Sequence, residues 1–309
     1  YRAAVVENDL FILNDSYLYL YSLHGDLKET RQLAYSKPIL KSNDYFALLY
    51  ENGGTRFRVD RQSGNVYTKT MDQAIITGAI SSTGVVALVT ESDLYSCVLQ
   101  IFDKNGKKLY TRNCIERLSD IAFNADSTGC VFTELSAVDG DVTATLKCIQ
   151  FDTTDYTWES KPLTTLSLAL SLTENNHACV IGDTTCAYYD DKGNLESQYD
   201  YGGTLENYAV DAGNTAVLIR DEEKRETKLV IFPGSASEPI EIVVNGDAKA
   251  VQVYGDRVYM MNAETVIAYN FSGKAVATVR LDSTYDSFLK KDNYLFLLRY
   301  DKIDRVDFK

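Results

Sequence analysis

Few residues of this sequence are of the kinds that carry out acid–base chemistry. Histidine, the commonest general base, occurs only as His24 and His177 among 309 residues. His24 lies in the turn-like segment Ser22-Leu23-His24-Gly25, where we expect a solvated side chain. His177 and Cys179 are two residues apart and would share one face of a β-strand, where a Cys–His pair could supply a thiolate nucleophile. No third residue that would orient the histidine is evident, and buried cysteines mostly serve packing, so we expect no catalytic residue.

Six cysteines give the sharpest local prediction. Taken as consecutive pairs, their midpoints fall on Asn105-Gly106, on Asp139 beside Gly140, and on Gly182-Asp183, which are all typical of hairpin turns. Each pair would therefore lie nearly opposite on adjacent strands. The pairs could form disulfides, which an extracellular location would favour, or they could be reduced apolar residues in equivalent slots of successive repeats. Directly opposed strand positions often strain the bond, and register can slip by one residue. The candidates are Cys97 with Cys114, Cys130 with Cys148, and Cys179 with Cys186.

Patterns typical of metal or cofactor sites are missing from the sequence. The cysteines never form a Cys-x-x-Cys pair, and Asp139-Gly140-Asp141 lacks the remaining ligands of a calcium loop. Gly53-Gly54 and Gly202-Gly203 are isolated pairs rather than phosphate-binding loops. The adjacent Asp190 and Asp191 would diverge in a turn instead of facing each other across a substrate. We therefore expect no cofactor and no metal.

The charge balance limits the partners of the chain. Lys and Arg number 31 against 44 Asp and Glu, a net charge of −13, which argues against binding to nucleic acid or to anionic lipid headgroups. No apolar run is long enough to span a membrane. Because the sequence starts at Tyr1 rather than at Met, we expect a signal peptide or membrane anchor upstream, and hence an extracellular or cell-envelope location.

The elements that would position these residues are short and repeated. Eight apolar runs of three to five residues recur, each bounded by Asn, Asp, Gly, Ser or Thr, as is typical of strands buried on both faces. They are Leu10–Leu13, Tyr45–Leu49, Val85–Val89, Cys130–Phe132, Ala178–Ile181, Ala216–Ile219, Val258–Met261 and Tyr294–Leu298.

An alternating strand and a turn follow each apolar run. The first residues after these strands are separated by 37 to 49 residues, with a mean near 41. This period is typical of a four-stranded propeller blade. Such a sheet cannot bury both faces alone, but packing against its neighbours can bury them. We therefore predict an all-β protein, residues 1–309 forming a single β-propeller domain with four antiparallel strands per blade and eight blades, or seven if the terminal units merge. The last unit stops after its third strand, so its outer strand would come from the N-terminus or from residues upstream.

One turn carries a family resemblance. Val59-Asp60-Arg61-Gln62-Ser63-Gly64-Asn65-Val66-Tyr67 resembles the core of the quinoprotein-dehydrogenase-type propeller repeat, with weaker echoes at residues 102–110, 189–195 and 269–276. The chain is also similar in style to propeller domains of unknown function from the envelopes of Gram-positive gut anaerobes. The tryptophan that usually locks neighbouring blades in the quinoprotein repeat is not repeated, since Trp158 is the only one. The resemblance implies a ring of blades, and it implies neither quinone binding nor dehydrogenase activity.

These observations favour a binding or scaffold protein over an enzyme. We expect a non-catalytic extracellular propeller of a membrane-anchored or secreted protein, with an unknown protein or carbohydrate partner bound by loops that rigid sheets hold in place. The alternative is a polysaccharide lyase or hydrolase with its site at the central channel. A third class, redox sensing through the cysteine pairs, would be tested by counting thiols in oxidised and reduced protein.

Overall fold

The computed structural model describes residues 2–234, 238–244, 247–300 and 302–309. All regular elements in these residues are β-strands, which form eight antiparallel sheets in chain order. The protein is thus an all-β, eight-bladed β-propeller with four antiparallel strands per blade, as the sequence predicts, and the seven-bladed alternative is wrong. In the described residues there is no helix with the length and apolar character needed to cross a bilayer.

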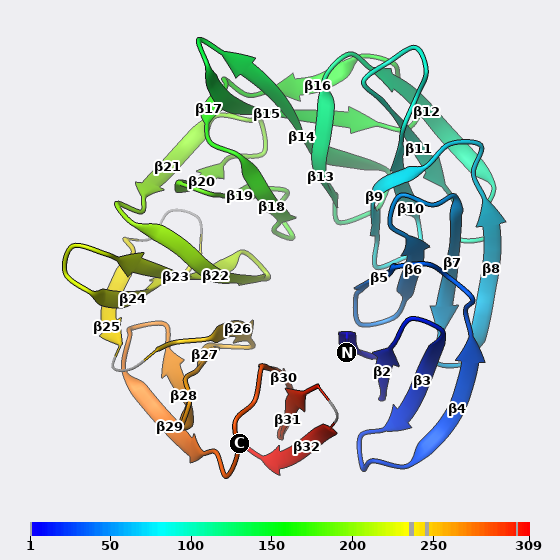
Figure 1. Cartoon of the computed structure of the whole chain (residues 1–309). Helices are drawn as coiled ribbons and strands as arrows, with labels where there is room; N and C mark the ends of the chain where they lie inside the picture. Colours follow the sequence, from blue (N-terminus) through cyan, green and yellow to red (C-terminus); the bar gives the residue numbers. More distant parts are fainter. Residues whose placement is uncertain (1, 235–237, 245–246, 301) are drawn as a thin grey trace. The chain divides into compact units, whose positions relative to one another are not determined.

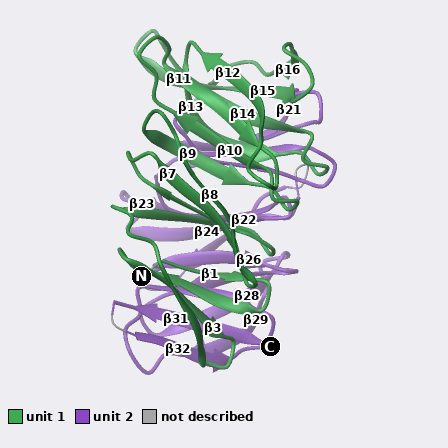
Figure 2. Ribbon diagram, turned by 90° about the vertical axis from the view of Figure 1, so that its right-hand side faces the viewer, with its two compact units in different colours: residues 1–164 green, residues 165–309 purple. Residues whose placement is uncertain are grey.

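The chain divides into two compact units, and unit 1, residues 1–164, holds the first four sheets (Figures 1 and 2). Sheet 1 contains β1 (Arg2–Val6), β2 (Asp9–Leu13), β3 (Tyr17–Ser22) and β4 (Leu27–Gln32). Sheet 2 contains β5 (Pro38–Ser42), β6 (Ala47–Glu51), β7 (Arg56–Arg61) and β8 (Gly64–Thr70). Sheet 3 contains β9 (Ile75–Ile80), β10 (Val86–Thr90), β11 (Cys97–Phe102) and β12 (Lys108–Cys114). Sheet 4 contains β13 (Arg117–Phe123), β14 (Gly129–Val138), β15 (Asp141–Gln150), β16 (Tyr156–Glu159) and the short β17 (Leu163–Thr164), which pairs with β15.

Unit 2, residues 165–309, holds the other four sheets. Sheet 5 contains β18 (Ser167–Leu172), β19 (Ala178–Gly182), β20 (Thr185–Tyr189) and β21 (Leu195–Asp200). Sheet 6 contains β22 (Thr204–Asp211), β23 (Asn214–Asp221), β24 (Glu226–Phe232) and β25 (Ile240–Val244). Sheet 7 contains β26 (Ala250–Tyr254), β27 (Arg257–Met261), β28 (Thr265–Asn270) and β29 (Ala275–Arg280). Sheet 8 contains β30 (Ser287–Lys291), β31 (Tyr294–Arg299) and β32 (Lys302–Asp307).

Burial along each strand follows its place in the sheet. Every predicted apolar run overlaps the second strand of a sheet, and β2, β6, β10 and β19 are buried along their whole length. The fourth strands, such as β12 and β21, carry mostly exposed or half-buried side chains in alternation. An apolar strand covered on both faces and a polar strand at the rim are what stacked sheets require.

Within each unit, neighbouring sheets bury their faces against each other. In unit 1, Phe57 of sheet 2 and Phe102 of sheet 3 have ring centroids 5.5 Å apart inside a fully buried cluster. In unit 2, Phe232 of sheet 6 lies 6.0 Å from the ring of Tyr188 and 5.4 Å from that of Tyr199, both in sheet 5. Aromatic pairs at these separations add to the free energy of burial, so they hold successive sheets together.

Sheet 8 is the last sheet, whose outer strand was expected to come from the N-terminus or from residues upstream. It has three strands in the described residues, ordered β30-β31-β32. The N-terminal strand β1 pairs with β2 as the first strand of sheet 1, over Arg2 to Val6. Arg2–Val6 is therefore the inner strand of sheet 1, and the expectation that the N-terminal residues supply the outer strand of sheet 8 is wrong for this segment.

Candidate functional site

The turn between the third and fourth strands has the same construction in four sheets. Its first residue is Ser22, Asp103, Asp190 or Asn270, and that side-chain oxygen accepts the backbone N–H groups two and four residues later. A glycine with a positive φ follows at the third position, as at Gly106 with φ 82°. These side chains cap their own turns, which is the usual task of Asx and Ser residues there.

Sheet 2 departs from this construction because it has one more residue before its glycine. The ladder between β7 and β8 extends through Asp60, opposite Asn65, and through Arg61, opposite Gly64. Asp60 therefore lies inside the strand pair rather than in the turn. Its carboxylate is fully buried, with 0% of the side chain exposed.

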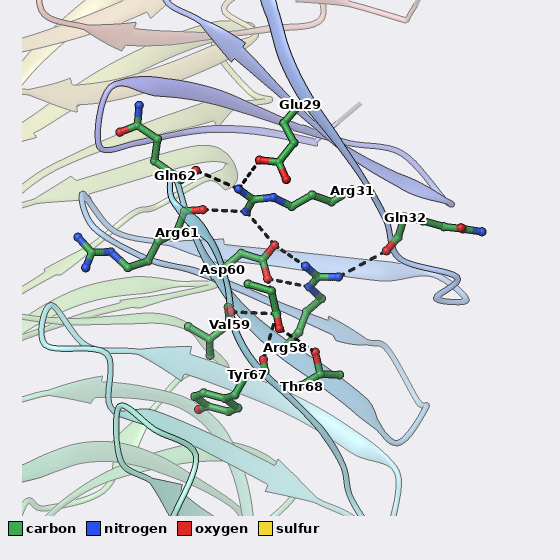
Figure 3. Close-up of polar contacts among 11 residues, drawn as sticks. Glu29, Arg31, Gln32, Arg58, Val59, Asp60, Arg61, Gln62, Tyr67 and Thr68 are labelled. Carbon is green, nitrogen blue, oxygen red and sulfur yellow. Dashed lines mark hydrogen bonds and ion pairs between the residues drawn. The ribbon is translucent and has the colours of Figure 1, made fainter.

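The buried Asp60 carboxylate binds two arginines, as Figure 3 shows. Arg31 of β4, in sheet 1, donates from Nη1 to Asp60 Oδ2 at 3.0 Å, and Arg58 donates from Nε and Nη2 at 2.7 Å each. Asn65 adds a bond of 2.8 Å to Oδ1. The Arg31 guanidinium also donates to the backbone carbonyl oxygens of Arg61, at 2.7 Å, and Gln62, at 3.0 Å.

This network joins sheet 1 to sheet 2. Both oxygens of Asp60 are occupied, and the side chain of Arg31 is also almost fully buried. Glu29 completes the set: Arg31 donates to it at 2.7 Å, and this bond is the main reason that the pKa of Glu29 is lowered. We assign the network to holding sheet 1 against sheet 2. Sequence reasoning found Asp60 in the family-like motif but missed its partner Arg31, which lies in the preceding repeat.

Cys97 and Cys114 lie directly opposite each other on neighbouring strands. They are direct register partners at the open ends of β11 and β12, and both are buried. The Cys114 thiol donates to the Arg112 carbonyl oxygen at 3.6 Å, and the Cys97 thiol donates to the Glu116 carbonyl oxygen at 3.5 Å. The interaction between the two cysteine side chains is the main reason that the pKa of Cys97 is lowered to about 7 while that of Cys114 is raised. All six cysteines are free thiols.

The other two pairs differ from the expected register. The β14–β15 ladder pairs Cys130 with Ile149 and Val131 with Cys148, so the two cysteines are offset by one residue and face opposite sides of the sheet. The prediction centred this hairpin on Asp139, but its centre lies between Asp139 and Gly140. The residue opposite Cys130 is therefore Ile149 instead of Cys148.

Cys179 and Cys186 share a face but lie diagonally. Cys179 is opposite Tyr188, and Cys186 is opposite Ile181, because the turn is Asp183-Thr184 rather than Gly182-Asp183. Their sulfur atoms are 3.9 Å apart, and Cys179 Sγ is 3.3 Å from the Thr215 hydroxyl.

His177 and Cys179, the candidate Cys–His pair, contact different residues. His177 Nδ1 lies 3.1 Å from Glu196 Oε2 at a partly exposed position, whereas Cys179 is buried against Cys186 and Thr215. Within the described ranges, no group of three or more His, Cys, Asp or Glu side chains is arranged to hold a metal ion.

A patch of exposed apolar side chains lies at one end of sheet 3. Leu94 and Tyr95, in the loop between β10 and β11, are 86% and 44% exposed, and Ile115, directly after β12, is 83% exposed. Both segments leave the sheet at the same end, because antiparallel strands put the second turn and the exit of the fourth strand together. We call Leu94, Tyr95 and Ile115 the apolar patch.

The backbone around the apolar patch is held in place. Ser92 Oγ accepts the N–H groups of Leu94 and Tyr95 at 3.2 Å each. Ser96 donates from its N–H to the Cys114 carbonyl at 3.0 Å and from its hydroxyl to the Ile115 carbonyl. A hydrophobic surface that is presented on an ordered backbone loses little conformational entropy when it binds.

Segments of the neighbouring sheets in unit 1 contact the loop that carries Leu94 and Tyr95. Gln73, after sheet 2, donates to Asp93 at 3.3 Å, and the N–H of Glu91 donates to the Ala74 carbonyl at 2.9 Å. On the other side, Arg117 of β13 donates to the Ser96 carbonyl at 3.3 Å. The exposed carboxylates of Glu91 and Asp93 give the loop an acidic rim. Sequence reasoning missed this site, although Leu94-Tyr95 is an apolar pair inside a Ser- and Asp-rich loop.

Comparisons with known proteins place the chain in a family. Residues 2–308 match the model of a family of unknown function, DUF5711, and the chain belongs to that family. No curated protein sequence matches it.

Solved structures show the same fold at low identity. BamB from Moraxella catarrhalis is 12% identical with a TM-score of 0.63, covering 98% of this chain and 92% of BamB. Sqt1 from Saccharomyces cerevisiae is 11% identical with a TM-score of 0.67, covering 98% and 93%. The Pan2 WD40 domain from Neurospora crassa is 10% identical with a TM-score of 0.54, covering 84% of each chain. The β-propeller fold, similar to that of the PQQ-like propeller BamB and of WD40 domains, is therefore shown.

Proposed function

We propose that this chain is a non-catalytic, protein-binding scaffold that uses the apolar patch of unit 1 as a contact surface. The observation that carries the proposal is the exposure of Leu94 and Ile115, at 86% and 83%, on backbone that hydrogen bonds hold. Exposed large apolar side chains that cluster on ordered loops are typical of interaction sites. The propeller fold fits such a role, because its stacked sheets give the loops a rigid base.

The charges around the apolar patch indicate the chemistry of the partner. Glu91 and Asp93 lie in the same loop as Leu94, Arg117 contacts the end of that loop, and the whole chain carries a net charge of −13. A partner segment with two or more apolar side chains flanked by Lys or Arg would bury the patch and pair with its rim. Burying one such apolar side chain contributes about 1.5–3 kcal/mol, enough for at least tenfold in affinity.

Selection from a random peptide library displayed on phage tests this function. We expect peptides selected on the wild-type protein to be rich in apolar and basic residues and to bind the double variant Leu94→Ser, Ile115→Ser at least about tenfold more weakly. The matched control is Val66→Ser, Leu109→Ser, which changes two exposed apolar residues on the outer strands β8 and β12 and should leave binding unchanged. Equal binding to all three proteins would contradict the proposal.

We also propose that the chain works outside the cell or in the cell envelope, carried there by a signal or an anchor outside these residues. Cys97 and Cys114 face each other across two strands, a placement compatible with a disulfide in such an oxidising location. Labelling intact cells with a membrane-impermeant biotin reagent should modify the protein. Labelling that requires cell lysis would rule this location out.

A further inference from the structure

The structure separates the three cysteine pairs by geometry. Direct partners in an antiparallel ladder have Cα atoms about 4.5–5.5 Å apart, which lies within the range of disulfides, and Cys97 and Cys114 are such partners. Cys179 and Cys186 occupy diagonal positions, whose Cα atoms are about 7–8 Å apart, so a disulfide between them would require the backbone to move even though their sulfur atoms are 3.9 Å apart. Cys130 and Cys148 point to opposite faces of their sheet.

We propose that Cys97 and Cys114, alone among the six cysteines, all of which the structure describes, form a reversible disulfide by exchange with a small-molecule disulfide, and that this bond fastens the base of the loop carrying Leu94 and Tyr95.

The exchange proceeds in two balanced steps. The Cys97 thiolate attacks one sulfur of the oxidant, whose S–S bond breaks, and the leaving thiolate takes up a proton. Cys114 then gives up its proton and attacks the Cys97 sulfur of the mixed disulfide, which releases the second thiol. Overall, two protein thiols lose two protons and two electrons, and one external disulfide is reduced to two thiols. Cys97 is suited to the first attack because its interactions with the Cys114 side chain, the Leu118 backbone and Arg117 favour the thiolate and lower the pKa of Cys97 to about 7.

The position of the pair explains how an oxidant reaches it. Both side chains are buried, with 0% of Cys97 and 4% of Cys114 exposed. However, Cys114 is the last residue of β12, which is the outer strand of sheet 3. Strand ends at a sheet edge open at low free-energy cost, and such an opening would expose both sulfurs. We therefore expect slow exchange that is limited by the opening of this strand end.

The bond would act directly on the apolar patch. Cys97 follows Ser96, the end of the loop that carries Leu94 and Tyr95, and Cys114 immediately precedes Ile115. Ser96 already bonds to the carbonyl oxygens of Cys114 and Ile115. A covalent link between Cys97 and Cys114 would stop these two segments from separating when the strand end opens.

Oxidised glutathione is the probe for the test. The folded protein is incubated with an excess of it, quenched in acid, alkylated and digested for mass spectrometry. We expect the loss of two of the six thiols, one cross-linked pair of peptides containing Cys97 and Cys114, and full recovery of both thiols with a reductant. Cys130, Cys148, Cys179 and Cys186 should stay alkylated.

Two cysteine variants and a hydrogen-exchange measurement test the disulfide and its effect on the loop separately. Cys130→Ala should retain the cross-link, whereas Cys97→Ala should abolish it. Amide hydrogen exchange in residues 91–96 should slow after oxidation, at least several-fold. Retention of all six thiols by the folded wild-type protein, or a cross-link between any other two cysteines, would overturn the assignment. Unchanged hydrogen exchange in an oxidised protein would overturn the fastening of the loop. Neither result bears on whether the patch binds peptides.

Discussion

Asp60 and Asp103 occur at similar places in the sequences of neighbouring sheets, but Asp60 lies in a strand ladder and Asp103 starts a turn. Asp103 is partly exposed and accepts two backbone N–H groups of its own turn, at 2.9 and 2.8 Å. Asp60 is fully buried and binds Arg31 and Arg58, thereby linking sheet 1 to sheet 2. The difference follows from one additional residue before the glycine of the second turn, which extends the ladder past Asp60.

This comparison shows that residue type alone does not fix a role in a repeat protein. An aspartate placed in a turn satisfies its nearest backbone donors, since no other donors compete. The same aspartate moved into the ladder points at the neighbouring sheet, where a buried carboxylate must find cations or pay a large desolvation penalty. A change in turn length thus turns a local cap into a link between sheets.

Removing the buried carboxylate should have the largest effect. We expect Asp60→Ala to lower the free energy of unfolding by about 3–5 kcal/mol, because it leaves the Arg31 and Arg58 guanidinium groups buried without their anion. Urea denaturation followed by circular dichroism measures the change. Asp60→Asn is the control of similar shape. It should lower the free energy of unfolding less than Asp60→Ala does, since its amide oxygen still accepts hydrogen bonds. If Asp60→Ala lowered the free energy of unfolding by less than an ordinary surface substitution does, the proposed link between sheets 1 and 2 would be wrong.

The capping aspartate should matter less. Asp103→Ala removes two hydrogen bonds to N–H groups that can bond to water instead, so we expect a loss of about 1 kcal/mol. The same denaturation assay measures it, and Asp103→Asn should restore most of the loss because Asn270 caps the turn of sheet 7 in the same way. If Asp103→Ala proved as costly as Asp60→Ala, the distinction between the two aspartates would fail.

The smallest effect concerns pH and a third capping residue, Asp190. Hydrogen bonds from the Asn194 side chain and then from backbone N–H groups lower the pKa of Asp190. Its stabilising contribution is therefore complete above the ordinary aspartate pKa and is lost as the pH falls through the lowered folded-state value. Carboxyl NMR titration should show this low pKa in the wild type and a rise toward the ordinary value in Asn194→Ala. An identical titration of Asp190 in both proteins would contradict the assigned cause.

Much of the fold could be predicted from local patterns. Short apolar runs such as Val258–Met261 predict second strands because a strand covered on both faces needs no polar alternation. Asx and Gly residues predict turns because they provide the cap and the positive φ, as at Asp103 and Gly106. These signals lie within a few residues of each other, so a single sequence contains them.

Contacts between repeats could not be predicted in the same way. The partner of Asp60 is Arg31, 29 residues earlier, and its side chain turns inward only because sheet 2 lies against it. The cysteine register shows the same limit on a shorter scale. Moving a turn centre by half a residue in sheet 4 placed Cys148 on the opposite face from Cys130, although the turn itself was predicted correctly. The apolar patch was missed because exposure depends on what the rest of the chain leaves uncovered.

The β14–β15 hairpin offers a practical handle on the molecule. Both strands are ten residues long, longer than any other described strand, and the Asp139-Gly140 turn joins them at exposed positions. Residues near this turn, such as Val138 and Val142, are exposed and contribute little to the core. A fluorescent label or a short epitope inserted at Gly140 should therefore be tolerated, and it would report on molecules that approach the turn between β14 and β15.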